Sequence, residues 1–82
     1  MRKPIIAGNW KMFKTVTEAV ALVREMRTDL GAVGEVERVL CPPFTSLSVV
    51  SELVKRTDLK VGAQDMHWED QGAFTGEVSP LM

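Results

Sequence analysis

The chain has 82 residues, of which 45% are hydrophobic and 26% are charged. That balance excludes an intrinsically disordered protein, and the length excludes a complete large α/β enzyme. The formal net charge of −1 gives no overall electrostatic reason to expect a nucleic acid or an anionic membrane as a partner. The distribution is uneven, since residues 1–14 hold four Lys and Arg and no acid, and residues 64–82 hold four acids and no Lys or Arg.

Cysteine usage and hydropathy indicate the compartment. The single cysteine, Cys41, cannot form an internal disulfide and lacks the companion ligands of a zinc site, so we expect a buried thiol in a reducing environment. No stretch approaches the roughly 20 apolar residues of a membrane span, and the apolar run that ends at Ala7 is too short for a signal peptide. We expect a cytoplasmic protein.

The first half of the chain predicts a strand and a helix. Residues 4–8 form an apolar run with β-branched side chains, which predicts a strand buried on both faces, as in a parallel sheet. Thr15 and Glu18 match a capping box, and Gly31 stands where a left-handed residue commonly ends a helix. Between them, helical spacing relates Val16, Ala19, Val20, Val23, Met26 and Leu30.

The next segments repeat this alternation. Residues 37–41 predict a second strand, which Pro42 and Pro43 end, and residues 59–63 predict a third. The helix between them ends at Lys55-Arg56, and its apolar face holds Leu47, Val50 and Val54. The order strand, helix, strand, helix, strand predicts an α/β fold with parallel strands and right-handed crossovers.

The C-terminal part predicts a long loop. Residues 64–79 show neither helical nor strand period, and loops longer than about 12 to 15 residues are commonly functional. The only histidine, His67, is interpreted as a partly exposed residue of this loop. Ser79-Pro80 is a helix-start signal, yet the chain ends two residues later. We therefore expect residues 1–82 to be a single partial domain, cut before a further helix.

Two polar residues lie at the end of the first predicted strand, where parallel α/β proteins bind their ligands. Lys11 offers a mobile ammonium group that can hold a phosphate or stabilise a developing oxyanion, and Asn9 offers an amide beside it. A lysine just past a strand is also commonly a solvated surface residue. Position alone leaves both interpretations open.

Two separated motifs resemble the triosephosphate isomerase family. One is Gly8-Asn9-Trp10-Lys11-Met12. The other, similar to that family's third βα loop, is Gly62-Ala63-Gln64 followed by Gly72-Ala73-Phe74-Thr75-Gly76-Glu77-Val78-Ser79. They occur in the right order and spacing, so the resemblance covers essentially the whole chain. It implies that the chain is the β-α-β-α-β portion of a TIM (β/α)8 barrel, about a third of one.

The resemblance also implies an activity. The family interconverts dihydroxyacetone phosphate and glyceraldehyde 3-phosphate through an enediolate, in glycolysis and gluconeogenesis, without a metal or organic cofactor. Asn9 matches the family's substrate-binding asparagine, and Lys11 matches its catalytic, substrate-binding lysine. The family's catalytic histidine and glutamate lie beyond residue 82, and His67 matches neither. We therefore expect the 82 residues alone to be inactive and to need the remaining barrel segment.

The third loop is implied to form a homodimer interface. In the family the residue that matches Thr75 approaches the partner's asparagine and lysine, and Asp65 stands where an asparagine is more usual. The interface residues implied by the resemblance are Gln64, Phe74, Thr75, Gly76 and Glu77.

Two other function classes stay open. A non-enzymatic fragment or association module would pair with the rest of a barrel, or with itself, to cover its unpaired strand edges. A small phosphate-binding or receiver-like α/β domain would carry a glycine-rich loop or an acidic pair after the first strand, where this chain has Asn9-Trp10-Lys11.

Overall fold

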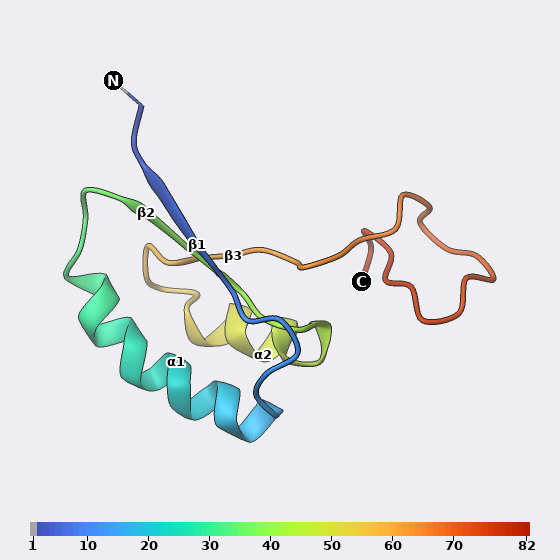
Figure 1. Cartoon of the computed structure of the whole chain (residues 1–82), viewed down its shortest axis with the longest axis horizontal. Helices are drawn as coiled ribbons and strands as arrows, with labels where there is room; N and C mark the ends of the chain where they lie inside the picture. The colour runs from blue at the N-terminus through green and yellow to red at the C-terminus, as the bar shows by residue number, and fades with distance from the viewer. Residues whose placement is uncertain (1) are drawn as a thin grey trace.

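The computed structural model describes residues 2–82 and contains five elements in the predicted order. They are β1 (Ile5–Asn9), α1 (Val16–Gly31), β2 (Glu37–Cys41), α2 (Phe44–Leu53) and β3 (Lys60–Val61). The strands form one parallel sheet in the order β1-β2-β3, and both helices lie on the same side of it (Figure 1). The predicted α/β architecture with parallel strands is confirmed.

The capping box at the start of α1 is confirmed and the helix ends at Gly31, but the left-handed residue predicted at this end is not found. Thr15 Oγ1 accepts a hydrogen bond from Glu18 N at 3.2 Å, and Glu18 Oε1 accepts one from Thr15 N at 2.9 Å. The backbone hydrogen bond from Thr15 holds the pKa of Glu18 below its usual value. Gly31 is the last helical residue, and Ala32 caps the helix at a right-handed φ of −80°. The Ala32 N–H donates to the carbonyl oxygens of both Asp29 and Leu30, so no left-handed residue is needed to satisfy these carbonyls.

The second crossover is close to the prediction, with a shorter third strand. α2 follows Pro43 directly and ends at Leu53, so Lys55 and Arg56 lie in the turn after it. β3 has two residues in place of the five predicted over residues 59–63. The backbone ladder ends at the bond from Gly62 N to Leu40 O, at 2.9 Å, because the next donor on the β2 side would be Pro42, which has no N–H.

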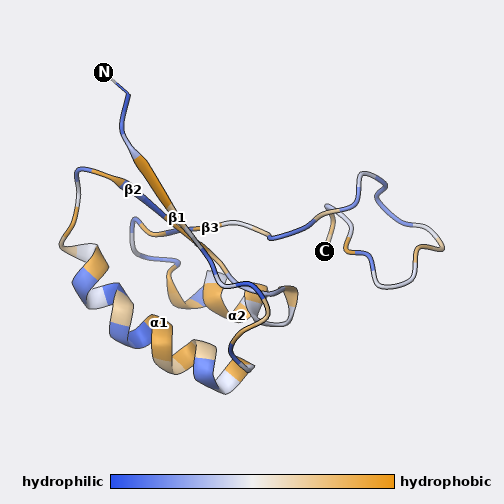
Figure 2. Cartoon of the chain, viewed as in Figure 1, coloured by the Kyte–Doolittle hydropathy of each residue, from blue (hydrophilic) through white to orange (hydrophobic). Residues whose placement is uncertain are grey.

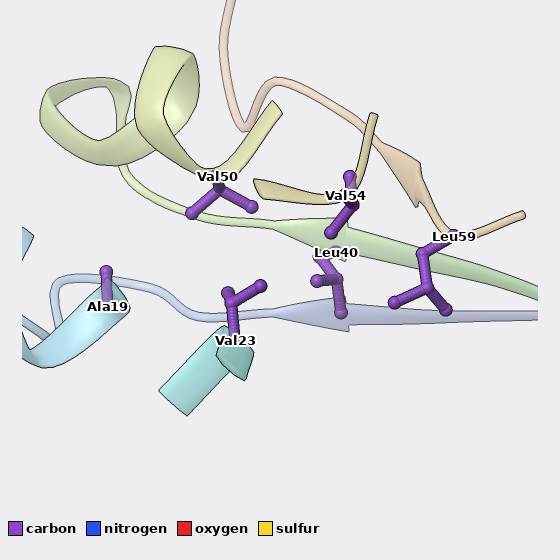
Figure 3. Close-up of a cluster of buried hydrophobic side chains, with 6 residues drawn as sticks. All are labelled: Ala19, Val23, Leu40, Val50, Val54 and Leu59. Carbon is purple, nitrogen blue, oxygen red and sulfur yellow. The ribbon is translucent and has the colours of Figure 1, made fainter. Parts of the chain in front are cut away.

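The hydrophobic core lies between the two helices and β2. It consists of the buried side chains of Ala19, Val23, Leu40, Val50, Val54 and Leu59 (Figure 3). Ala19 and Val23 come from the predicted apolar face of α1, Val50 comes from the predicted face of α2, and Val54, on the same predicted face, caps the end of α2. The helical periodicity therefore identified the part of the core that the two helical segments contribute.

β1 is exposed, contrary to the prediction that it is buried on both faces. Ile5 and Ile6 are 67% and 64% exposed, although the strand is strongly apolar (Figure 2). β1 is an edge strand that pairs only with β2, and the core forms around β2 and α2. Its composition is that of a central strand, so its apolar surface is available for further strands and helices.

A buried arginine joins three segments at the other end of the sheet. Arg38 is 5% exposed, and its guanidinium donates to the carbonyls of Val36 and Leu30, the latter in the last turn of α1. Its Nη2 lies 2.6 Å from Asp58 Oδ2, in the turn before β3. This hydrogen bond holds the pKa of the Asp58 carboxyl below its usual value. A charge buried in this way needs such partners, and here they fix α1 and the α2–β3 turn to β2.

Most of the segment after Gln64 projects away from the sheet and helices (Figure 1). The Cα radius of gyration is therefore 13.8 Å, against about 12 Å for a compact chain of this length. The helix-start signal at Ser79 gives a single turn, closed by the bond from Met82 N to Ser79 O at 3.1 Å. Within residues 2–82, no helix has the length and apolarity that a membrane crossing requires.

Candidate active site at the end of strand β1

Lys11 has a strained backbone at the carboxyl end of β1. Its φ is +56°, in the left-handed region that a residue with a Cβ atom adopts at a cost of roughly 1–2 kcal/mol. The side chain of Asn9 stabilises this conformation, because Asn9 Oδ1 accepts a hydrogen bond from Lys11 N at 2.9 Å. Strained residues persist where surrounding contacts over-determine them, and they cluster at functional sites. The two residues predicted from the sequence are therefore brought together by a local turn.

The side chain of Gln64 also supports this turn, from a position after β3 at the opposite edge of the sheet. Its Nε2 donates to the carbonyl oxygen of Cys41 at 2.8 Å and to that of Lys11 at 3.1 Å. Trp10 N donates to the same Cys41 oxygen at 3.1 Å. One amide side chain thus joins the carboxyl ends of all three strands, and it sets the position of the Lys11 backbone.

The face of the sheet opposite the helices carries Asn9. Paired residues of parallel strands point to the same side, and side chains alternate along each strand. Leu40 faces the helices, so its neighbours in the ladder face them too, and the odd-numbered residues of β1 and β2 face away. Asn9 and Cys41 are paired on that face, and a Cβ atom on Gly62 would lie 3.3 Å from Cys41 Sγ. Cys41 is half-buried, whereas a buried thiol was predicted.

A groove of about 500 Å³ opens beside Lys11. Three segments form it, namely the turn after β1, the start of α2 and the loop that follows β3, which contributes residues from its beginning and from its C-terminal part. Its lining is mostly apolar and contains Lys11, Met12, Pro43, Phe44, Leu47, Ala63, Gln64, Asp65, Gly76 and Val78. The groove therefore places an ammonium group next to an apolar surface.

The predicted interface residues fall into two groups. Gln64 and Gly76 line the groove beside Lys11. Phe74 and Glu77 line a separate small cavity of about 40 Å³ within the projecting loop, and Thr75 is exposed. The prediction for His67 is wrong, because it is only 8% exposed and is enclosed by the side chains of its own loop.

Sequence reasoning missed one contribution to this site and two buried polar side chains elsewhere in the fold. Gln64 was predicted as an interface residue, and its bonds to Cys41 and Lys11 were not foreseen. Arg38 and His67 were not expected to be buried. The available signal for Gln64 was its place directly after the third strand, where side chains meet those at the ends of neighbouring parallel strands. Among residues 2–82, no group of three or more His, Cys, Asp and Glu residues could hold a metal ion.

The fold and the site define an α/β protein that presents an asparagine and a lysine at the carboxyl ends of parallel strands. The triosephosphate isomerase family model matches residues 4–82. Triosephosphate isomerases from Chloroflexus aurantiacus and Alkaliphilus metalliredigens are each 56% identical to the chain, and that from Dictyoglomus thermophilum is 52% identical. Each match covers the whole chain and 33% of the relative. The chain belongs to the triosephosphate isomerase family, and it spans about a third of the length of these relatives.

The family assignment explains the architecture. The three strands and two helices correspond to the N-terminal third of the family's barrel, in which eight parallel strands close into a ring surrounded by helices. The exposure of β1 then has a physical cause, since a barrel places another strand against each edge and side chains of other strands against the inner face. The implied fold, a portion of a TIM barrel, is confirmed.

Proposed function

We propose that residues 1–82 form the first third of a triosephosphate isomerase that interconverts dihydroxyacetone phosphate and glyceraldehyde 3-phosphate. The observation that carries the proposal is the left-handed Lys11, held by Asn9 and Gln64 at the carboxyl end of β1 in a chain of this family. TIM-barrel enzymes build their active sites at this end of the strands. The reaction belongs to glycolysis and gluconeogenesis, and we place it in the cytoplasm.

Lys11 and Asn9 have distinct roles in this proposal. Lys11 is the catalytic residue of this segment, and its ammonium binds the anionic substrate and stabilises the negative charge that develops on the enediolate oxygen. Asn9 binds substrate and also fixes the Lys11 turn through Oδ1. A preorganised cation is more effective than a mobile one, because its orientation does not change during the reaction.

Proton transfer requires groups that this segment does not supply. The resemblance places the family's catalytic histidine and glutamate beyond residue 82, and His67 is enclosed in the projecting loop. We therefore expect the 82 residues to be inactive alone and to act with the remaining barrel segment. The exposed apolar edge of β1 at Ile5 and Ile6 is the surface that the remaining barrel segment would cover.

A full-length chimera tests the enzymatic proposal. It joins residues 1–82 to the remaining two thirds of the Chloroflexus aurantiacus relative, and the assay measures isomerisation of purified protein free of host enzyme. Lys11→Ala should reduce kcat by at least about 100-fold, because it removes the transition-state charge interaction. Lys14→Ala is the matched control, since Lys14 also has a positive φ and lies three residues away without the bonds to Asn9 and Gln64. Equal loss in both variants, or an active Lys11→Ala, would contradict the role of Lys11.

We also propose that the full-length protein is a homodimer, with the projecting loop of one subunit bound to the groove of the other. A twofold interface uses the same patch on both subunits, so the loop and its receptor must lie together. Gly76 and Val78, in the C-terminal part of the loop, line the same groove as Lys11 and Phe44, which supports such a patch. Thr75, which is exposed on the loop, would then approach the partner's Asn9 and Lys11.

Sedimentation equilibrium of the full-length chimera tests the dimer. We expect a dimer whose activity falls on dilution, because each site would be completed by the partner's loop. Deleting residues 72–76 should yield monomers, while Asp70→Ala, in the same loop, should not. An active chimera that is monomeric at all concentrations would refute the interface and leave the enzymatic proposal standing.

A second candidate function is an association module without activity. The bare edge of β1 favours it for the isolated segment, because unpaired strands pair readily with other chains. Size-exclusion chromatography of the 82 residues alone distinguishes the outcomes. A monomer that unfolds cooperatively would contradict self-association through this edge.

A further inference from the structure

The projecting loop closes on itself between His67 and Val78. His67 N donates to the carbonyl oxygen of Val78 at 2.7 Å, and Glu77 N donates to that of Phe74 at 3.2 Å. The two ends of the segment are thus joined, as in an Ω-loop, in which side chains of the loop pack against one another. Apart from Gly76 and Val78, which also line the groove beside Lys11, the loop lies away from the sheet and helices (Figure 1), so its shape depends mainly on contacts within it.

The His67 side chain is the centre of this packing. Its ring lies 4.2 Å from the Trp68 ring, nearly stacked at 27°, and 4.2 Å from the Phe74 ring at 40°. Trp68 is 81% exposed, so it covers the His67 ring while most of its own side chain remains in contact with solvent. Aromatic contacts of this kind add to the energy of simple area burial. The histidine therefore takes the place that an apolar core residue has in a larger domain.

Phe74 is fixed from a second direction by Gly72. A Cβ atom on Gly72 would lie 2.6 Å from Phe74 Cε2 and 2.9 Å from Cδ2, so the ring rests on the glycine backbone. The φ of Gly72 is +159°, which residues with side chains rarely adopt. Phe74 is thus held between the His67 ring and the Gly72 backbone, and the exposed Thr75 follows it directly.

The polar atoms of His67 contribute less to this arrangement than its ring. Nδ1 lies 3.8 Å from Glu77 Oε2, beyond hydrogen-bond distance. Nε2 is buried and has no hydrogen-bond partner among the described residues. A phenylalanine at this position would keep both ring contacts, so the contribution of the ring can be separated from that of the nitrogen atoms.

We propose that His67 is a positioning residue for the subunit interface, whose ring holds Phe74 and so presents Thr75 in the conformation that a second copy of this chain binds. This inference rests on the proposed homodimer. A loop that is already ordered loses less conformational entropy on association, so preorganisation raises affinity without any new contact. His67 acts from inside the loop, with its ring turned to Trp68 and Phe74.

The test compares His67→Ala, His67→Phe and the control Asp70→Ala in the full-length chimera. Sedimentation equilibrium should show a dimer Kd raised by about 10-fold or more for His67→Ala, and by less than about 3-fold for the other two variants. Gly72→Ala should also raise Kd, because its Cβ displaces the Phe74 ring. This variant decides the outcome if His67→Ala does not fold.

Three results would overturn the proposal. One is a His67→Ala dimer as tight as the parent, and another is a His67→Phe dimer as weak as His67→Ala, which would assign the effect to the contact between Nδ1 and Glu77. The third is a Kd unchanged by Gly72→Ala where His67→Ala does not fold.

Hydrogen exchange separates this inference from the homodimer proposal. The amide of residue 67 donates to Val78 and should be protected in the parent and in His67→Phe, but not in His67→Ala, while protection of α1 stays the same. This pattern is expected even if the chimera is monomeric, in which case only the interface would be refuted. Equal protection in all three proteins would show that His67 does not position the loop.

Discussion

The bonds of Gln64 to the Lys11 turn give the most direct test of how the site is held. Nε2 of Gln64 donates to the Cys41 carbonyl at 2.8 Å and to the Lys11 carbonyl at 3.1 Å. Gln64→Ala removes both bonds, and Gln64→Glu removes both while keeping the length of the side chain, because a carboxylate cannot donate. Either change leaves only Asn9 to support the left-handed backbone of Lys11.

The expected magnitude follows from these contacts. A neutral hydrogen bond contributes about 0.5–1.5 kcal/mol, and at an exposed side chain such as Gln64 water replaces part of that, so the two bonds together are worth about 1–2 kcal/mol. The left-handed conformation of Lys11 opposes them by a similar amount, roughly 1–2 kcal/mol. Without Gln64 the turn relaxes, and kcat/KM should fall by about 5- to 30-fold.

Steady-state kinetics of the full-length chimera measure this loss. The assays run at protein concentrations far above the dimer Kd, since Gln64 is also a predicted interface residue. Gln64→Glu should be at least as impaired as Gln64→Ala, because its added carboxylate also repels the anionic substrate. If both variants stay within twofold of the parent, and their crystal structures retain the positive φ of Lys11, the proposed role of Gln64 is refuted.

Three further predictions concern stability of the same chimera, measured by thermal and denaturant unfolding. Thr15→Ala should lower the free energy of unfolding by about 1 kcal/mol, while Thr15→Ser retains the cap; equal losses would contradict the capping box. Val50→Ala should lower it by roughly 1–3 kcal/mol because Val50 is fully buried, and a smaller loss than at exposed Val16→Ala would contradict the core. The guanidinium of Arg38 lowers the pKa of Asp58, so this stabilisation is present above the unfolded-state pKa and is lost as the pH falls through the folded-state pKa. Asp58→Asn should therefore flatten the decline of Tm below about pH 4, and an unchanged acid limb would exclude this carboxyl as its source.

The local features of the fold could be predicted because neighbouring residues encode them. The capping box joins Thr15 and Glu18 across three positions, and the apolar period of α1 selects Ala19 and Val23 for the core. Both features depend only on residues within a few turns of one another, so the local sequence is sufficient to predict them. The left-handed cap predicted at Gly31 was wrong, although the helix ends there, because several ways of satisfying the last carbonyls have similar energies.

Burial could not be predicted in the same way. The apolar composition of β1 suits a strand with neighbours on every side, yet Ile5 and Ile6 are exposed where such neighbours are not in place. His67 shows the opposite error, since it was predicted to be partly exposed and is enclosed by aromatic side chains of its own loop. Arg38 is likewise buried, by partners elsewhere in the fold, although charged residues are usually exposed. Exposure is a property of the assembled surface and not of the residue.

The sequence by itself determined the order of the elements, the identity of the lysine and asparagine at the end of β1, and the family to which these motifs belong. Only the tertiary structure decided how Lys11 is held, because the bonds of Gln64 reach across 53 positions to Lys11 and 23 positions to Cys41. Such contacts form only once parallel strands place their carboxyl ends side by side. No local sequence pattern specifies these contacts, because they depend on the assembled sheet.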